Sequence, residues 1–126
     1  MLSLSASTRI FLVTGSTDMR KSFDALSAIV SGALEHDLYT GHLYVFCNRP
    51  RNHLKILVWD RSGFLIVAKR LEKGTFAWPQ SAETTIDMTP EELALLLGGI
   101  DLRDAKRRRW YERPEVESRK TLVSSR

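Results

Sequence analysis

The sequence contains a single cysteine, and this scarcity limits the kinds of site that it can build. One thiol, Cys47, cannot form an internal disulfide or supply the thiolate set of a zinc site. Because Cys47 lies in an apolar run, we expect a small core residue; the alternative is a reactive thiol. A chain without disulfides suits the reducing cytoplasm, the compartment that we expect, with or without association with the nucleoid.

Long hydrophobic runs are also missing. No apolar stretch approaches the roughly 20 residues that a membrane-spanning helix needs, and residues 1–7 lack the basic and apolar regions of a signal peptide. We therefore expect no membrane partner. At 126 residues, of which 43% are hydrophobic and 27% charged, the chain is long enough for one globular domain with its own core.

Patterns typical of catalysis and nucleotide binding are absent as well. Residues 14–17 precede a predicted helix as a phosphate loop does, but they lack the G-x-x-x-x-G-K-[ST] pattern. The three histidines have no metal-ligand spacing, and no serine lies in a nucleophile elbow. Four carboxylates could in principle form a two-metal nuclease site: Asp18, Asp24, Asp60 and Glu72. Their predicted positions, in turns and on a helix surface, favour structural roles instead. We therefore predict a protein that is not an enzyme and has no metal or cofactor.

Positive charge is concentrated in one short segment. Residues 1–102 carry ten Lys and Arg against eleven Asp and Glu, a net charge of −1, whereas residues 103–113 carry six against two, a net charge of +4. Such a segment indicates an acidic partner, because its cations can neutralise DNA phosphates and its Trp110-Tyr111 pair can stack on bases. The alternative is a solvated tail with Trp110 docked on the domain. The candidate nucleic-acid-binding residues here are Arg103, Lys106, Arg107, Arg108, Arg109, Trp110 and Arg113.

Four more cations extend this set of candidates. Arg49 and Arg51 lie in a predicted turn, and Arg20 and Lys21 lie in the first turn of a predicted helix, whose free N–H groups attract anions. We add all four to the candidate DNA contacts. The alternative to DNA contacts, and the favoured one from residue type alone, is that these four cations lie in ordinary solvated turns.

The apolar pattern predicts an α+β fold that begins with a strand and a helix. Residues 9–13 form a short apolar strand, and Thr17 or Asp18 can cap the helix that follows. Apolar residues recur every three or four positions and form one face of this helix: Met19, Phe23, Leu26, Val30 and Leu34. We expect this face to enter the core.

The middle of the chain predicts an antiparallel meander over residues 42–78. Its apolar or alternating runs are separated by turns too short for a parallel crossover: 43–47, 54–59, 64–71 and 76–79. Alternation in the second run places Leu54, Ile56 and Val58 in the core. Trp59 falls on the other face, where it and Trp78 either cover the sheet's own core, the favoured interpretation, or offer a platform to a partner.

A capping box marks a second helix. Thr89 precedes Pro90, and Glu92 completes the Thr-x-x-Glu pattern, so a helix should start at Pro90 and end before Gly98-Gly99. We therefore expect one small α+β domain, an antiparallel meander with two packed helices, over residues 1–102. A basic C-terminal arm over residues 103–126 follows it.

Several of these segments resemble one known family. Residues 14–24 are similar to the family signature TGPTDMRKSFDG, and further matches occur in order along the chain, at residues 41–46, 48–49, 54–57, 59–60, 63–64, 69–79 and 95–101. The family is the TnpB (second open reading frame) accessory protein of the IS-sixty-six group of bacterial insertion sequences. The resemblance covers about residues 8 to 102, and the basic arm has looser counterparts.

The resemblance implies a function in transposition without catalysis. Such elements encode a separate DDE transposase, so we expect this chain to assist it by binding DNA, the transposase and the other accessory protein of the element. The alternative is a pure protein adaptor that holds the transposase and touches no DNA. A small nuclease is a third, disfavoured hypothesis. The family supplies no catalytic residues to carry over.

Overall fold

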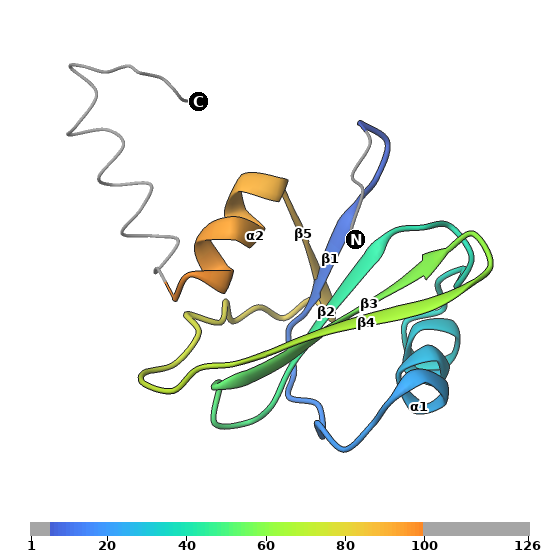
Figure 1. Cartoon of the computed structure of the whole chain (residues 1–126). Helices are drawn as coiled ribbons and strands as arrows, with labels where there is room; N and C mark the ends of the chain where they lie inside the picture. Colours follow the sequence, from blue (N-terminus) through green and yellow to red (C-terminus); the bar gives the residue numbers. More distant parts are fainter. Residues whose placement is uncertain (1–5, 100–126) are drawn as a thin grey trace, which may run out of the picture.

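The computed structural model describes residues 6–99, and in this part of the chain five strands form one mixed sheet in the order β4-β3-β2-β1-β5 (Figure 1). The elements along the chain are β1 (Ile10–Val13), α1 (Phe23–Ala28), a π-helical extension η1 (Ile29–Ala33), β2 (Leu43–Cys47), β3 (His53–Asp60), β4 (Gly63–Arg70), β5 (Thr85–Met88) and α2 (Pro90–Leu97). The predicted α+β class is confirmed, and β2, β3 and β4 form the predicted antiparallel meander.

The first strand joins the meander in parallel. β1 pairs with β2 in parallel register, with Phe11 opposite Tyr44, and α1 lies in the crossover between the two strands. A parallel pair needs a long connection of this kind, which residues 14–42 supply. The carboxyl ends of β1 and β2 therefore meet at the same end of the sheet.

The prediction that the meander continues through residues 76–79 is wrong. Residues 76–79 leave the sheet, and Phe76 and Trp78 instead pack over the face that α2 also covers. The Trp78 indole N–H donates to the Val13 carbonyl at 3.0 Å, which draws the chain across the sheet. Beyond it β5, which the sequence analysis did not predict, pairs antiparallel with β1 at the far edge.

A helix covers each face of the sheet, so the core has two parts (Figure 1). The α2 side consists of Ile10, Leu12, Leu43, Val45, Cys47, Leu54, Ile56, Val58, Phe76, Met88, Leu93 and Leu96. The α1 side consists of Phe11, Val13, Leu26, Val30, Tyr44, Phe46 and Leu57. The alternation predicted for β3 is confirmed, and Cys47 is the buried core residue that the sequence indicated.

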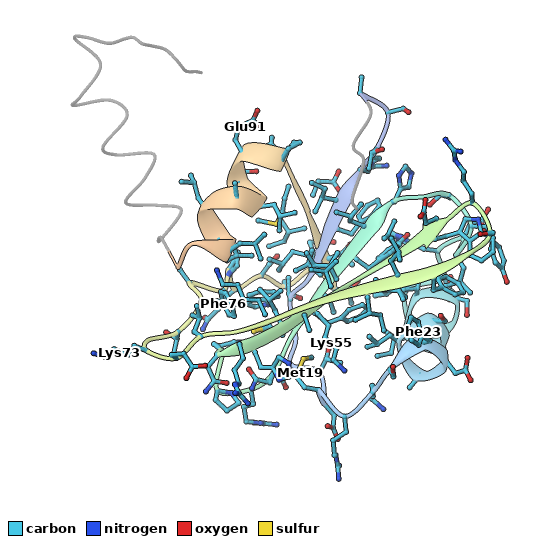
Figure 2. All side chains as sticks on the ribbon, viewed as in Figure 1. Met19, Phe23, Lys55, Lys73, Phe76 and Glu91 are labelled. Atoms are coloured by element: carbon cyan, nitrogen blue, oxygen red, sulfur yellow. The ribbon has the colours of Figure 1, made fainter. Side chains whose placement is uncertain are left out.

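The first helix starts later than predicted. Neither Thr17 nor Asp18 caps it: the Asp18 carboxylate accepts the backbone N–H of Arg20 at 2.9 Å, which closes a turn before the helix begins at Phe23. Leu26 is fully buried as expected, but Phe23 is 45% exposed, so its predicted place in the core is wrong. Figure 2 shows Phe23 at the start of α1. The face that α1 lays on the sheet therefore begins at Leu26.

The second helix forms as its sequence predicts. The Glu92 N–H donates to Thr89 Oγ1 at 3.1 Å, and the Thr89 N–H donates to Glu92 Oε1 at 2.9 Å, which completes the capping box. Pro90 occupies the first turn, where its missing N–H leaves no hydrogen bond unmade. Leu93 and Leu96 then fix the helix on the sheet.

Candidate nucleic-acid interface

Most described cations lie at one end of the sheet, where β1, β2 and β4 finish and β3 begins. We call this the basic end. Of the ten Lys and Arg in residues 6–99, it holds eight: Arg20, Lys21, Arg49, Arg51, Lys55, Lys69, Arg70 and Lys73. Four carboxylates accompany them, giving 8 − 4 = +4: Asp18, Asp24, Glu72 and Glu83. The charge of the described residues is thus not evenly spread along the sheet.

The opposite end, which we call the acidic end, has the reverse balance. Its two cations, Arg9 and Arg61, stand against six carboxylates, giving 2 − 6 = −4: Glu35, Asp37, Asp60, Asp87, Glu91 and Glu92. Figure 2 shows Lys73 in the loop that follows β4 and Glu91 at the start of α2. Because the described body is neutral as a whole, this separation of charge arises from the fold and not from composition.

An open hollow of about 560 Å³ lies at the basic end, between the loop after β1 and the turn after β2. The Thr17 N–H donates to the Cys47 carbonyl at 2.7 Å and holds the two loops together. The hollow is lined by Ser16, Thr17, Asp18, Met19, Arg20, Asn48, Arg49 and His53. Two predicted contacts, Arg20 and Arg49, therefore lie in one concave surface, although they are 29 positions apart in the sequence.

The two lining arginines differ in what they can offer an anion. Arg20 binds Asp18 through Nη2 at 2.6 Å and through Nε at 3.0 Å, and these hydrogen bonds lower the pKa of Asp18 to about 2. Asp18 therefore stays ionised and offsets the charge of Arg20. Arg49 is exposed, and its side chain has no hydrogen-bond or ion-pair partner among the described residues. Arg49 is thus the more available cation of the hollow.

Arg51 has a structural position. Its guanidinium donates to the carbonyls of Thr14 and Asn48 at 3.3 Å and of Gly15 at 3.4 Å, and it lies 5.4 Å from the centre of the Trp78 ring. These contacts join the turn after β2 to the loop after β1. The expectation of a solvated turn residue does not hold for Arg51, because its donors are used within the fold.

Two lysines at the basic end also bind backbone carbonyls. Lys55 Nζ donates to the carbonyls of Met19 and Lys21 at 2.9 and 2.8 Å, and Lys69 Nζ donates to the Leu97 carbonyl at 2.7 Å. The sequence analysis assigned neither role. For Lys55 the one signal was its place between two apolar residues of a strand, and Lys69 had no such signal. Neither can be told from a solvated lysine without its distant partner.

The predicted helix-terminus site of Arg20 and Lys21 is wrong. Both residues precede α1 in the turn that Asp18 closes, so they do not form the first turn of a helix. Lys21 remains exposed, and no described residue forms an ion pair or hydrogen bond with its side chain. It can still contribute charge to the basic end.

The histidine of the hollow contributes little charge near neutral pH. Burial, together with the nearby Lys55 and Arg70, lowers the pKa of His53 below its ordinary value of 6.5. Burial likewise raises the pKa of the Cys47 thiol, which agrees with a core residue and not with a reactive thiolate.

The candidate residues of the arm, from Arg103 to Arg113, lie outside the described residues, as does the predicted domain boundary at residue 102. The described chain finishes at Gly99, directly after α2. Because Lys69 binds the Leu97 carbonyl, this point of departure is at the basic end. The described chain therefore stops at the end of the sheet that carries most of the described cations.

Within residues 6–99, no group of three or more His, Cys, Asp and Glu side chains could hold a metal ion. Asp18 and Asp60, two of the nuclease candidates, lie at opposite ends of the sheet. In the same described range, no helix is long and apolar enough to cross a membrane.

The two tryptophans behave differently. Trp78 packs against the core on the α2 side, as the favoured interpretation predicted. Trp59 is half-buried at the acidic end, edge-on to Tyr39 at 4.9 Å and to Phe64 at 5.1 Å between ring centres. Tyr39 is 61% exposed, so these three rings form an aromatic cluster that solvent reaches. The sequence analysis had not brought Tyr39 or Phe64 to Trp59.

Comparison with known proteins decides the family. The family described as IS66 Orf2 like protein matches residues 8–107, which include every described helix and strand. The chain belongs to this family. Two relatives from Sinorhizobium fredii (strain NBRC 101917 / NGR234), both named as uncharacterized proteins, support the match. y4jC is 35% identical over 108 residues, 86% of this chain and 92% of the relative. y4hO is 37% identical over 103 residues, 82% and 90% respectively.

The resemblance stated from the sequence is therefore confirmed, and it ties this IS66 Orf2 like protein to insertion sequences and to an accessory role in their transposition. No solved structure matches the chain.

Proposed function

We propose that this IS66 Orf2 like protein is a non-catalytic accessory protein of transposition that binds DNA through its basic end and arm. One observation carries the proposal: eight of the ten described cations gather at the end of the sheet from which the +4 segment departs. Cations gathered at one end of the described sheet concentrate positive potential there, as a surface for a polyanion requires.

The hollow gives this surface a shape. Arg49 lines it and Lys21 lies close by, and both have side chains without described partners. Lys73, beyond β4, is exposed in the same way. These contacts suit phosphates and carry no base readout, so the binding proposed here has no sequence preference from the described residues.

A second candidate function rests on a different observation. The aromatic cluster of Tyr39, Trp59 and Phe64 lies at the acidic end, away from the proposed DNA surface. Exposed aromatic side chains are enriched at protein interfaces. This supports a protein adaptor that holds the element's DDE transposase or its other accessory protein and makes no DNA contact.

The two functions separate by the salt dependence of DNA binding. Changing Lys106, Arg107, Arg108 and Arg109 to Ala should reduce the log–log salt slope on duplex DNA by roughly 3–4 units, because each lost phosphate contact removes about 0.9. Arg61→Ala, which removes one exposed cation from the acidic end, is the control and should leave the slope unchanged.

An unchanged affinity and slope in the four-alanine variant would remove the DNA-binding proposal. The adaptor would then be tested by capture of the transposase with and without DNA of the element's ends. Capture that needs no DNA and is lost in Trp59→Ala, with thermal stability retained, would favour the adaptor. Metal-dependent cleavage of DNA by the purified chain would revive the nuclease hypothesis.

A further inference from the structure

The β4 strand is an edge of the sheet, with β3 as its neighbour on one side only. Hydrogen bonds in an antiparallel pair alternate along the strand, and the bond from the Leu71 N–H to the Asn52 carbonyl, 2.8 Å, fixes the phase. By this alternation, Phe64, Ile66 and Ala68 direct their N–H and C=O groups away from β3. No described residue forms a hydrogen bond to these outward groups.

Over residues 63–68, before the charged pair Lys69 and Arg70, the side chains of β4 also lack the usual protection of an edge. Residues 64–67 are four consecutive apolar residues, each only half-buried, and Ala68 is exposed. The register with β3 is continuous over eight residues, so no bulge interrupts it, and residues 63–68 contain neither proline nor charge. Protein edges normally carry at least one such device against pairing with another chain.

The other edge of the same sheet is protected. β5 has four residues, and its exposed Asp87 forms an ion pair with Arg9. A short strand with charge on it is a poor template for a further strand. The contrast within one sheet marks β4 as the edge that is open for pairing (Figure 1).

We propose that β4 pairs antiparallel with β4 of a second copy of this chain, which joins two sheets into one of ten strands. Outward-facing residues must lie opposite each other, so we place Ile66 opposite Ala68 of the second copy, with Val67 on the two-fold axis. This register satisfies the outward groups of both strands, because each copy offers the other the same spacing of donors and acceptors.

The charges on β4 favour an antiparallel over a parallel pair, and they favour a second copy of this chain as the partner. Lys69 and Arg70 stand at one end of β4 and would lie side by side in a parallel pair, whereas the antiparallel pair separates them. In the proposed register Arg70 of the second copy lies opposite Phe64, beside the aromatic cluster with Trp59 and Tyr39. A guanidinium on these rings gains a cation–π contact, so the cationic end of each strand meets the aromatic end of the other.

The dimer also bears on DNA binding, and this step rests on the proposed function. An antiparallel pair sends the two basic ends in opposite directions along the joined sheet. Each copy then presents its own arm and hollow, so one dimer can hold two DNA segments at once. The dimer itself does not depend on DNA.

The test uses the full chain without DNA. Light scattering during gel filtration should give twice the 14.4 kDa mass of one chain, falling toward that mass on dilution. Amide hydrogen exchange of Phe64, Ile66 and Ala68 should be slow in the concentrated protein and become fast on dilution. A mass of 14.4 kDa at every concentration, with these amides always exchanging fast, would overturn the proposal.

Substitution at Ala68 separates pairing from folding. Ala68→Pro removes an N–H that β3 does not use and a side chain that is exposed, so the chain should fold and stay monomeric. Ala68→Ser keeps the N–H and should remain a dimer. If Ala68→Pro does not fold, Ala68→Lys gives the same comparison by placing a charge at an exposed position of the edge.

The remaining outcomes are also decisive. A dimer that persists in Ala68→Pro and Ala68→Lys must use another surface and would refute this one. A monomer whose β4 amides become protected only when the transposase is added would assign the edge to that protein instead. The two proposals fail separately in the unsubstituted chain: a monomer at every concentration that still binds DNA refutes only the dimer, and a dimer that does not bind DNA refutes only the proposed function.

Discussion

Two arginines in the same turn should respond in opposite ways to substitution by alanine. Arg49 is exposed without a described partner, whereas Arg51 binds three carbonyls and lies on the Trp78 ring. We expect Arg49→Ala to change DNA binding and leave stability intact. We expect Arg51→Ala to change stability first. The sequence alone does not distinguish the two, because both are arginines in the same predicted turn.

The geometry sets the size of the Arg51 effect. Its hydrogen bonds of 3.3–3.4 Å are longer than the optimum, so each should contribute toward the low end of the usual range. Three of them with the ring contact suggest a loss of about 2 kcal/mol in the free energy of unfolding. The melting temperature should then fall by roughly 8–16 °C in a domain of this size.

The backbone allows a further check on the same residue. Arg51 has a φ of 63°, in the left-handed region that disfavours a side chain. Arg51→Gly loses the same contacts but removes this strain, so it should be about 1 kcal/mol more stable than Arg51→Ala. Arg61, with a φ of 59° at the acidic end, is the matched control, and Arg61→Ala should leave both stability and DNA affinity unchanged.

Thermal melts and DNA titrations at several salt concentrations measure both effects. Arg49→Ala should shift stability by less than about 0.5 kcal/mol and reduce the log–log salt slope by about 0.9. The assignment of Arg51 to the fold would be refuted if Arg51→Ala melted like the parent while losing DNA affinity. The assignment of Arg49 to DNA would be refuted if its variant bound with the parental slope.

Two further predictions concern stability alone. Burial chiefly lowers the pKa of His42 and of His53 below 6.5, so the unfolded chain binds protons at higher pH than the folded one. The part of the free energy of unfolding that depends on these histidines should be fully present above about pH 6.5 and decrease as the pH falls below it. Denaturant titrations of a variant with both changed to Gln should therefore show a flatter pH dependence. Thr89→Ala removes the helix cap and should cost about 1 kcal/mol in chemical unfolding; an unchanged midpoint would contradict the capping role.

Features set by neighbouring residues were predictable from the sequence. The alternation of β3 depends only on successive side chains pointing to opposite faces, so Ile56 and Leu57 were assigned to the correct sides. The Thr89 capping box likewise needs only residues three positions apart. Such patterns depend only on residues close together in the sequence, and tertiary contacts did not change the structures that they predict.

Features set by distant partners were not predictable. Asp18 has the chemistry of a helix cap, but its carboxylate binds Arg20 instead. Lys55, 34 positions beyond Lys21, binds carbonyls of the same loop. That loop therefore stays non-helical until Phe23. β5 is four residues long and exists because β1 offers it an edge some 70 positions earlier. In each case the deciding partner lies in another element.

The same distinction governs the electrostatic argument for DNA binding. Of the eight cations at the basic end, five have intramolecular partners: Arg20, Arg51, Lys55, Lys69 and Arg70. The other three, Lys21, Arg49 and Lys73, have none among the described residues. A cation that already binds a carbonyl or carboxylate must give up that contact to meet a phosphate, so we count the three unpartnered cations first. Through the counterions that they displace from the DNA, these three should contribute a slope of about 3 × 0.9, roughly 2.7 units. Residues 103–113 carry six cations. We therefore expect a measured slope well above 2.7 to include contacts from the arm, and the excess should disappear when Lys106, Arg107, Arg108 and Arg109 are changed to Ala.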